Sequence, residues 1–186
     1  MKITPEESIF YQALATTSLL RELSDNNFLK SDYYNDKCFK SNNDSGFKKI
    51  LEESGGIGNP ATMQMFLYIL LVMPKEMLEN NDSFLNEMKS EINRDFQKYI
   101  CFVNTTYHGE SEDNIDFYKH TRNAVSHSKC FYEVDDKGIC YVTFKDTNFK
   151  DKNQHCEFKI KTADVGTILT NLQIHMIRFL NKRFNR

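Results

Sequence analysis

The hydrophobic periodicity of this 186-residue chain changes after His127, and that change limits the folds it can adopt. Up to His127, apolar residues recur every three or four positions, the spacing of helices that bury one face. From Cys130 to Ile160 they largely alternate with polar residues, which is typical of short strands. Helical spacing then returns near Thr162. This order predicts a mainly α fold, a helical bundle with a small antiparallel β-hairpin or meander inserted before the C-terminal helix.

Capping and breaking residues set the expected bounds of the helices. Thr4 and Pro5 suit a helix start, and so do Asn59 and Pro60. Pro74 should end or bend the helix that Pro60 begins. The expected helices span residues 4–23, 44–53, 60–74, 83–103 and 112–127, and a last helix is expected to be capped by Thr162 or Asp164. Asp82 or Ser83 is expected to cap the helix at 83–103. Residues 28–46 are expected to form a loop with one short helical turn.

The β insertion is expected at about residues 129–161. Strands at 130–134 and 139–145 flank Asp135-Asp136-Lys137-Gly138, which is a good turn sequence, and a third short strand is expected at 155–160. The glycine-rich segment 54–58 is interpreted as a helix stop and a turn. It does not fit a phosphate-binding loop, because no strand precedes it and no Gly-Lys-Ser/Thr follows it.

The composition predicts one domain, residues 1–186, with one aromatic-rich core. Hydrophobic residues make up 40 % of the chain, with 15 Phe and 9 Tyr. The longest apolar run is too short to cross a bilayer, so no membrane partner is expected. Five cysteines lie without any C-x-x-C pair, which favours free thiols in a cytoplasmic protein and predicts no metal site and no cofactor.

The charge is unevenly distributed along the chain, although the formal net charge is only −2. Residues 1–118 carry 11 Lys and Arg against 19 Asp and Glu, whereas residues 119–186 carry 13 against 7. The C-terminal part is therefore the part to which a phosphate backbone would be drawn, provided that these residues also lie together in space.

One segment, residues 112–127, combines a helical pattern with a row of reactive groups. On a helix at about 100° per residue, its side chains divide into an apolar arc and a polar arc. The polar arc is expected to face a binding surface and contains Asp116, Lys119, His120, Arg122, Asn123, Ser126 and His127.

Arg122-Asn123 followed by His127 resembles the signature of HEPN domains, in which four to six residues separate an arginine, often followed by asparagine, from a histidine. The order of elements around it, a motif helix followed by a β-hairpin and a final amphipathic helix, resembles HEPN groups associated with plasmids and phage defence. The resemblance implies a HEPN-like helical bundle. Many members of this family are metal-independent ribonucleases.

The resemblance implies a reaction in which a ribose 2′-hydroxyl attacks the adjacent phosphate, giving a 2′,3′-cyclic phosphate and a 5′-hydroxyl. It assigns catalysis to Arg122, His127 and Asn123, since imidazole moves protons near neutral pH and guanidinium grips phosphate. The substrate contacts expected beside them are Lys119, His120, Ser126 and Lys129. One Arg and one His make half of such a site, so the resemblance also implies a homodimer that acts on RNA in prokaryotic defence or as a toxin, with an antitoxin or defence-system partner.

Two other interpretations fit the same residues. The chain could be a non-catalytic HEPN-like module that binds nucleotide or RNA or mediates dimerisation, with Arg122 and His127 in an ion pair or polar cluster. It could also be a helical scaffold whose polar arc is merely solvated. HEPN toxins that are silenced by nucleotidylation carry Tyr two residues after the motif His; Lys129 stands at that place, which argues against that particular partnership.

Overall fold

The computed structural model describes residues 5–40, 45–77 and 83–184. The described part is mainly helical, with a small antiparallel sheet before the C-terminal helix, as the periodicity predicted. Its elements are α1 (Pro5–Asp25), η1 (Phe28–Lys30), α2 (Asp32–Lys37), α3 (Ser45–Glu53), η2 (Gly56–Gly58), α4 (Pro60–Leu67), the π-helical η3 (Tyr68–Val72), α5 (Met73–Met77), α6 (Ser83–Tyr99), β1 (Ile100–Thr105), α7 (Phe117–Ser126), β2 (Cys130–Val134), β3 (Cys140–Thr147), β4 (His155–Lys161) and α8 (Thr162–Phe184).

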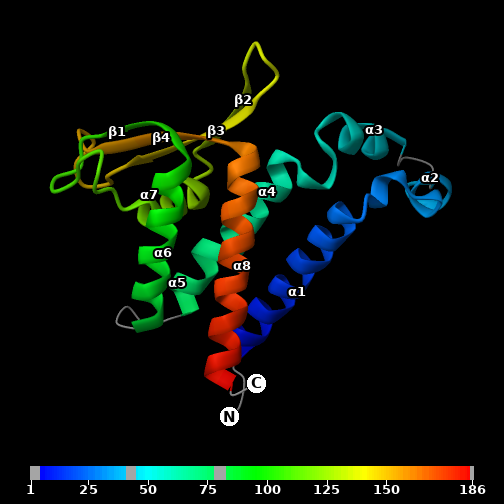
Figure 1. Cartoon of the computed structure of the whole chain (residues 1–186), viewed down its shortest axis with the longest axis horizontal. Coiled ribbons are helices and arrows are strands. Elements are labelled where there is room, and N and C mark those ends of the chain that lie inside the picture. The colour runs from blue at the N-terminus through cyan, green and yellow to red at the C-terminus, as the bar shows by residue number, and fades with distance from the viewer. Residues whose placement is uncertain (1–4, 41–44, 78–82, 185–186) are drawn as a thin grey trace.

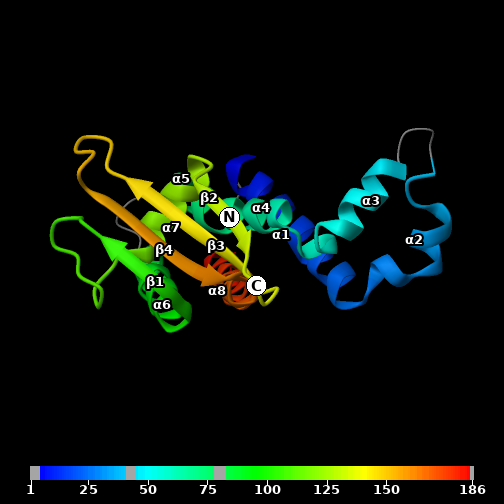
Figure 2. The same ribbon diagram turned by 90° about the horizontal axis from the view of Figure 1, so that it is seen from above.

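The sheet lies on one side of the molecule and the helices pack beneath it (Figure 1). Helices α6, α7 and α8 lie directly under the strands, and α7 contacts β3 along its length. Helix α1 runs alongside the bundle and leads to α2 and α3, which lie at the end of the molecule away from the sheet (Figures 1 and 2). In the part of the chain that the structure describes, helices therefore cover one face of the sheet.

Within the described residues, four strands form the sheet in the order β1-β4-β3-β2. Strands β2, β3 and β4 make the predicted meander, and its first turn lies at the predicted Asp135–Gly138 position. Alternate residues of β3 and β4 face the helices. The inward residues pair across the two strands as Val142 with Ile160, Phe144 with Phe158, and Asp146 with Cys156.

Strand β1 was not predicted, because residues 83–103 fit a single helix. Tyr99 and Val103 continue the apolar stripe of α6, and the turn residues Gly and Pro are missing from the junction. The chain nevertheless becomes extended at Ile100 and pairs with β4, with an irregularity in register between Ile100 and Phe102. Pairing with a distant strand outweighed the local helical pattern.

Four aromatic rings join the helices to the sheet. Phe96 of α6 lies 6.1 Å from Phe117 of α7, 6.3 Å from Phe144 of β3 and 5.9 Å from Phe158 of β4, measured between ring centroids. All four side chains are almost completely buried. This cluster fixes the height of α7 beneath the sheet.

The apolar helix that starts at Pro60 behaves as predicted at its start and differs at its end. Asn59 caps it by accepting a hydrogen bond from the Thr62 amide at 3.0 Å. Near Pro74 the helix widens into the π-helical η3 and continues as α5. Proline has no N–H and its ring would collide with the carbonyl of Leu70, four residues earlier, so a wider turn accommodates it.

The segment between α1 and α3 is more helical than the predicted loop. Ser31 caps α2 by accepting from the Tyr34 amide at 3.1 Å, and the Tyr34 ring is buried against Phe28 and Phe39. Glycines at 55 and 56 have positive φ and form the predicted turn. Thr4, Asp44 and Asp82, which were predicted at helix starts, lie outside the described residues. Helix α6 begins at Ser83 and α8 at Thr162.

All five cysteines are free, as their spacing predicted. None of the helices in the described ranges combines the length and the hydrophobicity that a membrane span requires.

The aromatic cluster predicts a large stability effect for Phe96→Ala. Removing a fully buried ring leaves a cavity among three other aromatic side chains and should lower the free energy of unfolding by about 3–5 kcal/mol. Phe149→Ala is the matched control, because that ring is 97 % exposed and its loss should change stability by less than about 0.5 kcal/mol. Chemical denaturation of both variants measures the difference. Equal stabilities would contradict the assigned core.

Candidate functional site

Helix α7, which carries the Arg-Asn and His motif, is shorter than predicted, and its start is fixed by two side chains. Residues 112–116 form a loop instead of the first helical turn, because Asp116 caps the helix by accepting from the Lys119 amide at 3.1 Å. Asn93 of α6 accepts from the Tyr118 amide at 2.7 Å. The Tyr118 hydroxyl donates to the Leu71 carbonyl in η3 at 3.3 Å. Helix α7 is thus attached to two other helical segments before the motif begins.

The end of α7 places His127 at the surface. Ser128 adopts a left-handed conformation with φ of 54°, its amide donates to Val125 at 3.2 Å, and the Lys129 amide donates to Ala124 at 2.8 Å. These two bonds make a Schellman motif, in which His127 is the C-cap residue. The backbone carrying His127 is therefore held firmly, while its side chain faces solvent.

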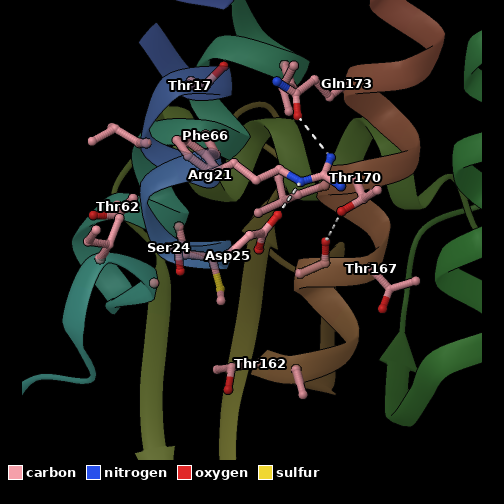
Figure 3. A pocket seen from close by; sticks show the side chains of 18 residues that line it. Thr17, Arg21, Ser24, Asp25, Thr62, Phe66, Thr162, Thr167, Thr170 and Gln173 are labelled. Carbon is pink, nitrogen blue, oxygen red and sulfur yellow. Dashed lines mark hydrogen bonds and ion pairs between the residues drawn. The ribbon is translucent and has the colours of Figure 1, made fainter. Parts of the chain in front are cut away.

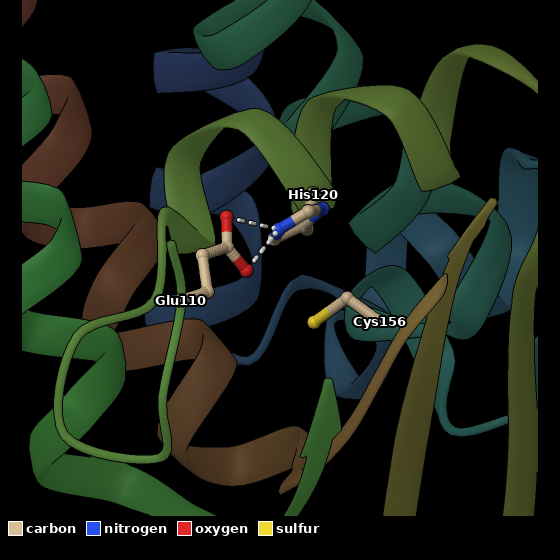
Figure 4. Close-up of side chains that lie close together, drawn as sticks. All are labelled: Glu110, His120 and Cys156. Carbon is tan, nitrogen blue, oxygen red and sulfur yellow. Dashed lines mark hydrogen bonds and ion pairs between the residues drawn. The ribbon is translucent and has the colours of Figure 1, made fainter. Parts of the chain in front are cut away.

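A buried histidine lies between two carboxylates at the centre of the site. His120 is 0 % exposed; its Nδ1 lies 2.7 Å from Asp146 Oδ2, and its Nε2 lies 2.9 Å from both carboxylate oxygens of Glu110 (Figure 4). Carboxylate oxygens accept hydrogen bonds and do not donate them, so both nitrogens can donate at once only in the imidazolium form. The geometry suits a buried cation held between two anions.

Asp146 collects three hydrogen bonds on one oxygen. Besides His120, the Tyr107 hydroxyl donates to Oδ2 at 3.0 Å and Asn123 Nδ2 donates to it at 3.1 Å. Burial alone would raise the pKa of Asp146, but the hydrogen bonds from His120, Asn123 and Tyr107 outweigh it and hold that pKa below its ordinary value. Burial and the bond to Asp146 raise the pKa of Tyr107. The carboxylate is therefore ionised and fully engaged.

This network continues from the buried carboxylate to the motif arginine. Asn123 Oδ1 accepts from Arg122 at 2.7 Å while its Nδ2 donates to Asp146, so both ends of the amide are used. Only one orientation of the amide satisfies both neighbours. The half-buried guanidinium is consequently oriented by a carboxylate that it does not touch.

A second branch of the network reaches Lys119. Its Nζ lies 3.9 Å from Glu110 Oε1 and 4.1 Å from the ring centroid of Tyr107. Thr105 of β1 donates to Glu110 Oε2 at 3.1 Å. The Glu110 carboxylate, which lies in the loop between β1 and α7, is thus held by three residues from two elements, Thr105 of β1 and Lys119 and His120 of α7.

The structure separates the residues of the predicted polar arc. His120 was expected on the solvent-facing arc as a surface or substrate-contacting side chain; this placement is wrong, because it is completely buried and both ring nitrogens are engaged. Ser126 and His127 are exposed, Lys129 and Arg122 are half-buried, and Lys119 is engaged with Glu110. Helix α7 lies between the sheet and η3, so both of its sides are partly covered.

Sequence reasoning missed Glu110, Asp146, Tyr107 and Cys156. One signal was available for Asp146: it follows Val142 and Phe144 in the alternating pattern of a strand, which places an acidic residue on the buried face. A buried acid is seldom found without a partner. No comparable pattern identifies Glu110, because it lies in a loop.

A separate cavity of about 500 Å³ lies between α1, α4 and α8 (Figure 3). Several Thr side chains line it together with apolar side chains such as Phe66. Its one arginine, Arg21, already contacts Asp25 at 3.6 Å and Gln173 at 3.3 Å. The residues that line this cavity do not include any from α7, so it is distinct from the network around His120.

A comparison with protein families identifies the family of the chain. The family model described as HEPN pEK499 p136 matches residues 5–182, nearly the whole chain. The chain belongs to this HEPN family. No curated protein and no solved structure matched this HEPN domain.

The buried network predicts a large stability loss for Asp146→Asn. The substitution leaves the His120 cation with one carboxylate. It also places an amide NH₂ group, which can only donate, among the donors of His120, Asn123 and Tyr107. The free energy of unfolding should therefore fall by about 3–5 kcal/mol. Asp136→Asn, at an exposed turn position, is the control and should change stability by less than about 0.5 kcal/mol. Denaturant unfolding at neutral pH compares the two variants. Indistinguishable midpoints would show that Asp146 does not hold the network together.

Proposed function

We propose that this HEPN domain is a metal-independent endoribonuclease that acts as a homodimer in prokaryotic defence or in a toxin–antitoxin system. The position of Arg122 is the main support. Within the described residues, no carboxylate lies at ion-pair distance from its guanidinium, which is nevertheless oriented through Asn123 and Asp146. A fixed, charged guanidinium without a neutralising partner is suited to grip a phosphate.

The exposed face of the sheet is a less suitable surface for RNA than the C-terminal end of α7, and this contrast supports the same assignment. Two of its lysines are neutralised, because Lys145 lies 3.0 Å from Glu157 and Lys159 forms an ion pair with Glu133. The basic C-terminal part of the chain therefore does not present these lysines as free cations. Arg122 and the half-buried Lys129, near the C-terminal end of α7, are better placed to attract an RNA backbone.

In the proposed reaction, the His127 imidazole of one subunit takes the proton from a ribose 2′-hydroxyl. The 2′-oxygen attacks the neighbouring phosphorus, and the bond from phosphorus to the 5′-oxygen breaks. The partner subunit's His127, in its protonated form, gives a proton to that leaving oxygen. Arg122 stabilises the charge that gathers on the phosphorane, and the products are a 2′,3′-cyclic phosphate and a 5′-hydroxyl.

Asn123 has a positioning role in this proposal, since its amide already joins Arg122 to Asp146. Ser126, Lys129 and Lys119 are proposed as backbone contacts. His120 acts indirectly, because it holds Asp146 in place from within the core. The need for a 2′-hydroxyl restricts the reaction to RNA.

Substitution of the two motif residues tests the reaction. Arg122→Ala and His127→Ala should each lower the rate of RNA cleavage by about 10²–10⁴-fold, the usual contribution of a positioned acid, base or cation. Arg94→Ala and His108→Ala are matched controls, because both residues are exposed and lie on other elements. Cleavage of an end-labelled RNA in EDTA measures the rates. Full activity in His127→Ala, or loss of activity on chelation alone, would contradict the proposal.

The proposed shared site also predicts interference between subunits. When wild-type protein is mixed with a large excess of His127→Ala protein and allowed to exchange, most wild-type chains should enter mixed dimers, and the cleavage rate per wild-type chain should fall about tenfold or more. An equal excess of His108→Ala should not lower it. A rate unaffected by the His127→Ala chain, with a monomeric mass in solution, would rule out a composite site.

One observation favours a second candidate, a non-catalytic module that binds nucleotide or RNA or mediates dimerisation. The residues that the structure describes offer no hydrogen-bond partner for the His127 ring, whereas the neighbouring polar groups are densely bonded. Binding of RNA that depends on Arg122, without cleavage, would support this candidate over the enzyme.

A further inference from the structure

Three groups of the kind that bind transition metals meet beneath the sheet. Glu110 lies in the β1–α7 loop, His120 on α7 and Cys156 on β4, and their ligand atoms all lie within 4.8 Å of one another. Figure 4 shows the Cys156 sulfur pointing into the space beside the Glu110 carboxylate and the His120 ring. Cys156 is 1 % exposed and Glu110 12 %, so this is a built interior site with one side near solvent.

We propose that Glu110, His120 and Cys156 bind a single divalent transition-metal ion of the zinc class. Zinc takes carboxylate, imidazole and thiolate ligands together, usually in a tetrahedral arrangement. Three protein ligands leave the fourth position for a water molecule. The ion would not take part in the proposed reaction with RNA, although its ligand His120 also positions Asp146 through Nδ1.

The distances require only a small adjustment. In a tetrahedral site with a Zn–N distance of about 2.0 Å and a Zn–S distance of about 2.3 Å, neighbouring ligand atoms lie roughly 3.5 Å apart. The His120 Nε2 to Glu110 contact of 2.9 Å would open slightly to admit the ion, and the sulfur, which lies within 4.8 Å of the other ligand atoms, would move toward them by no more than about an ångström. Glu110 belongs to a loop, so its backbone can follow this movement.

The groups around the site already form the outer shell that such a metal uses. His120 Nδ1 lies 2.7 Å from the Asp146 carboxylate, and a carboxylate on the far nitrogen orients a ligating histidine and fixes its tautomer. Thr105 donates to Glu110 Oε2 and restrains that carboxylate. In the strand register Cys156 lies opposite both Thr105 and Asp146, so the sheet itself sets its position.

The exchange of metal for protons leaves the charge of the site unchanged. Without metal, the Glu110 and Asp146 carboxylates balance the His120 imidazolium and the Lys119 ammonium, and the thiol is neutral. Burial raises the pKa of Cys156 to about 12, consistent with a neutral thiol. When the ion binds, the Nε2 proton and the thiol proton leave, and two positive charges replace them. A buried site that stays neutral avoids the desolvation cost of an unmatched charge.

Binding of the ion at Nε2 would leave the contact from His120 Nδ1 to Asp146 in place. The series of hydrogen bonds that holds Asp146, Asn123 and Arg122 in place would therefore persist when metal is removed, which is compatible with cleavage in EDTA. Bound metal would join the loop, the helix and the strand and so stabilise the folded state.

Metal retention by the untagged 186-residue chain tests the proposal. After treatment with EDTA, addition of Zn²⁺ and desalting, the protein should retain about one equivalent of zinc by elemental analysis. Cys156→Ser and Glu110→Gln should lose it, while Cys101→Ser, which changes an exposed cysteine of β1, should retain it. Zinc should also raise the melting temperature of the wild type and the Cys101→Ser protein.

Cobalt gives a test that does not depend on the folding of any variant. Co²⁺ added to the metal-free wild-type protein should produce a thiolate-to-metal charge-transfer band in the near ultraviolet, and the Cys101→Ser protein should give the same band. Absence of the band in the wild type, absence of retained zinc, or equal retention by folded Cys156→Ser protein would overturn the site. None of these measurements uses RNA, so they and the cleavage assays can fail separately.

Discussion

The candidate site depends on a single buried carboxylate oxygen. Asp146 Oδ2 receives hydrogen bonds from His120, Asn123 and Tyr107, which come from the motif helix and from the loop before it. An ionised group in the interior is tolerated only when donors or cations compensate for the lost water. The need to compensate Asp146 therefore fixes how α7 is rotated against β3, and through Asn123 it fixes Arg122.

The rest of the fold restricts α7 from its other sides. The aromatic cluster around Phe96 sets its distance from the sheet, and Tyr118 attaches it to the π-helical segment that Pro74 makes necessary. The Schellman motif then ends the helix at His127. A helix with so many constraints has little freedom to change the relative positions of Arg122 and His127, and such rigidity is what a preorganised site requires.

Membership of the HEPN family describes the chain as a whole, whereas the geometry of α7 describes individual side chains. The family match covers nearly the whole chain, whereas the chemistry that we propose rests on particular side chains: a guanidinium oriented through Asn123 and an exposed imidazole at a helix end. The proposed metal site uses the buried His120 of the same helix, whereas the proposed reaction uses Arg122 and the exposed His127. Because successive side chains on a helix point in different directions, one short helix can carry both sites.

The sequence alone determined much of the fold. The stripes on α6 and α8, the cap at Asn59 and the turn at Asp135–Gly138 were readable because periodicity and capping are local properties. The motif residues Arg122, Asn123 and His127 were found in the same way, from spacing within one segment. The helical start of that segment was misplaced, because Asp116 was not identified as its cap.

Only the tertiary structure decided the rest. Strand β1 exists because β4 lies beside it, and His120 is buried because Asp146 and Glu110 meet its two nitrogens. Glu110 and Cys156 are brought to His120 by the path of a loop and the register of a sheet. A sequence pattern shows which residues of one segment share a face, but contacts between distant segments depend on packing, which a local pattern does not encode.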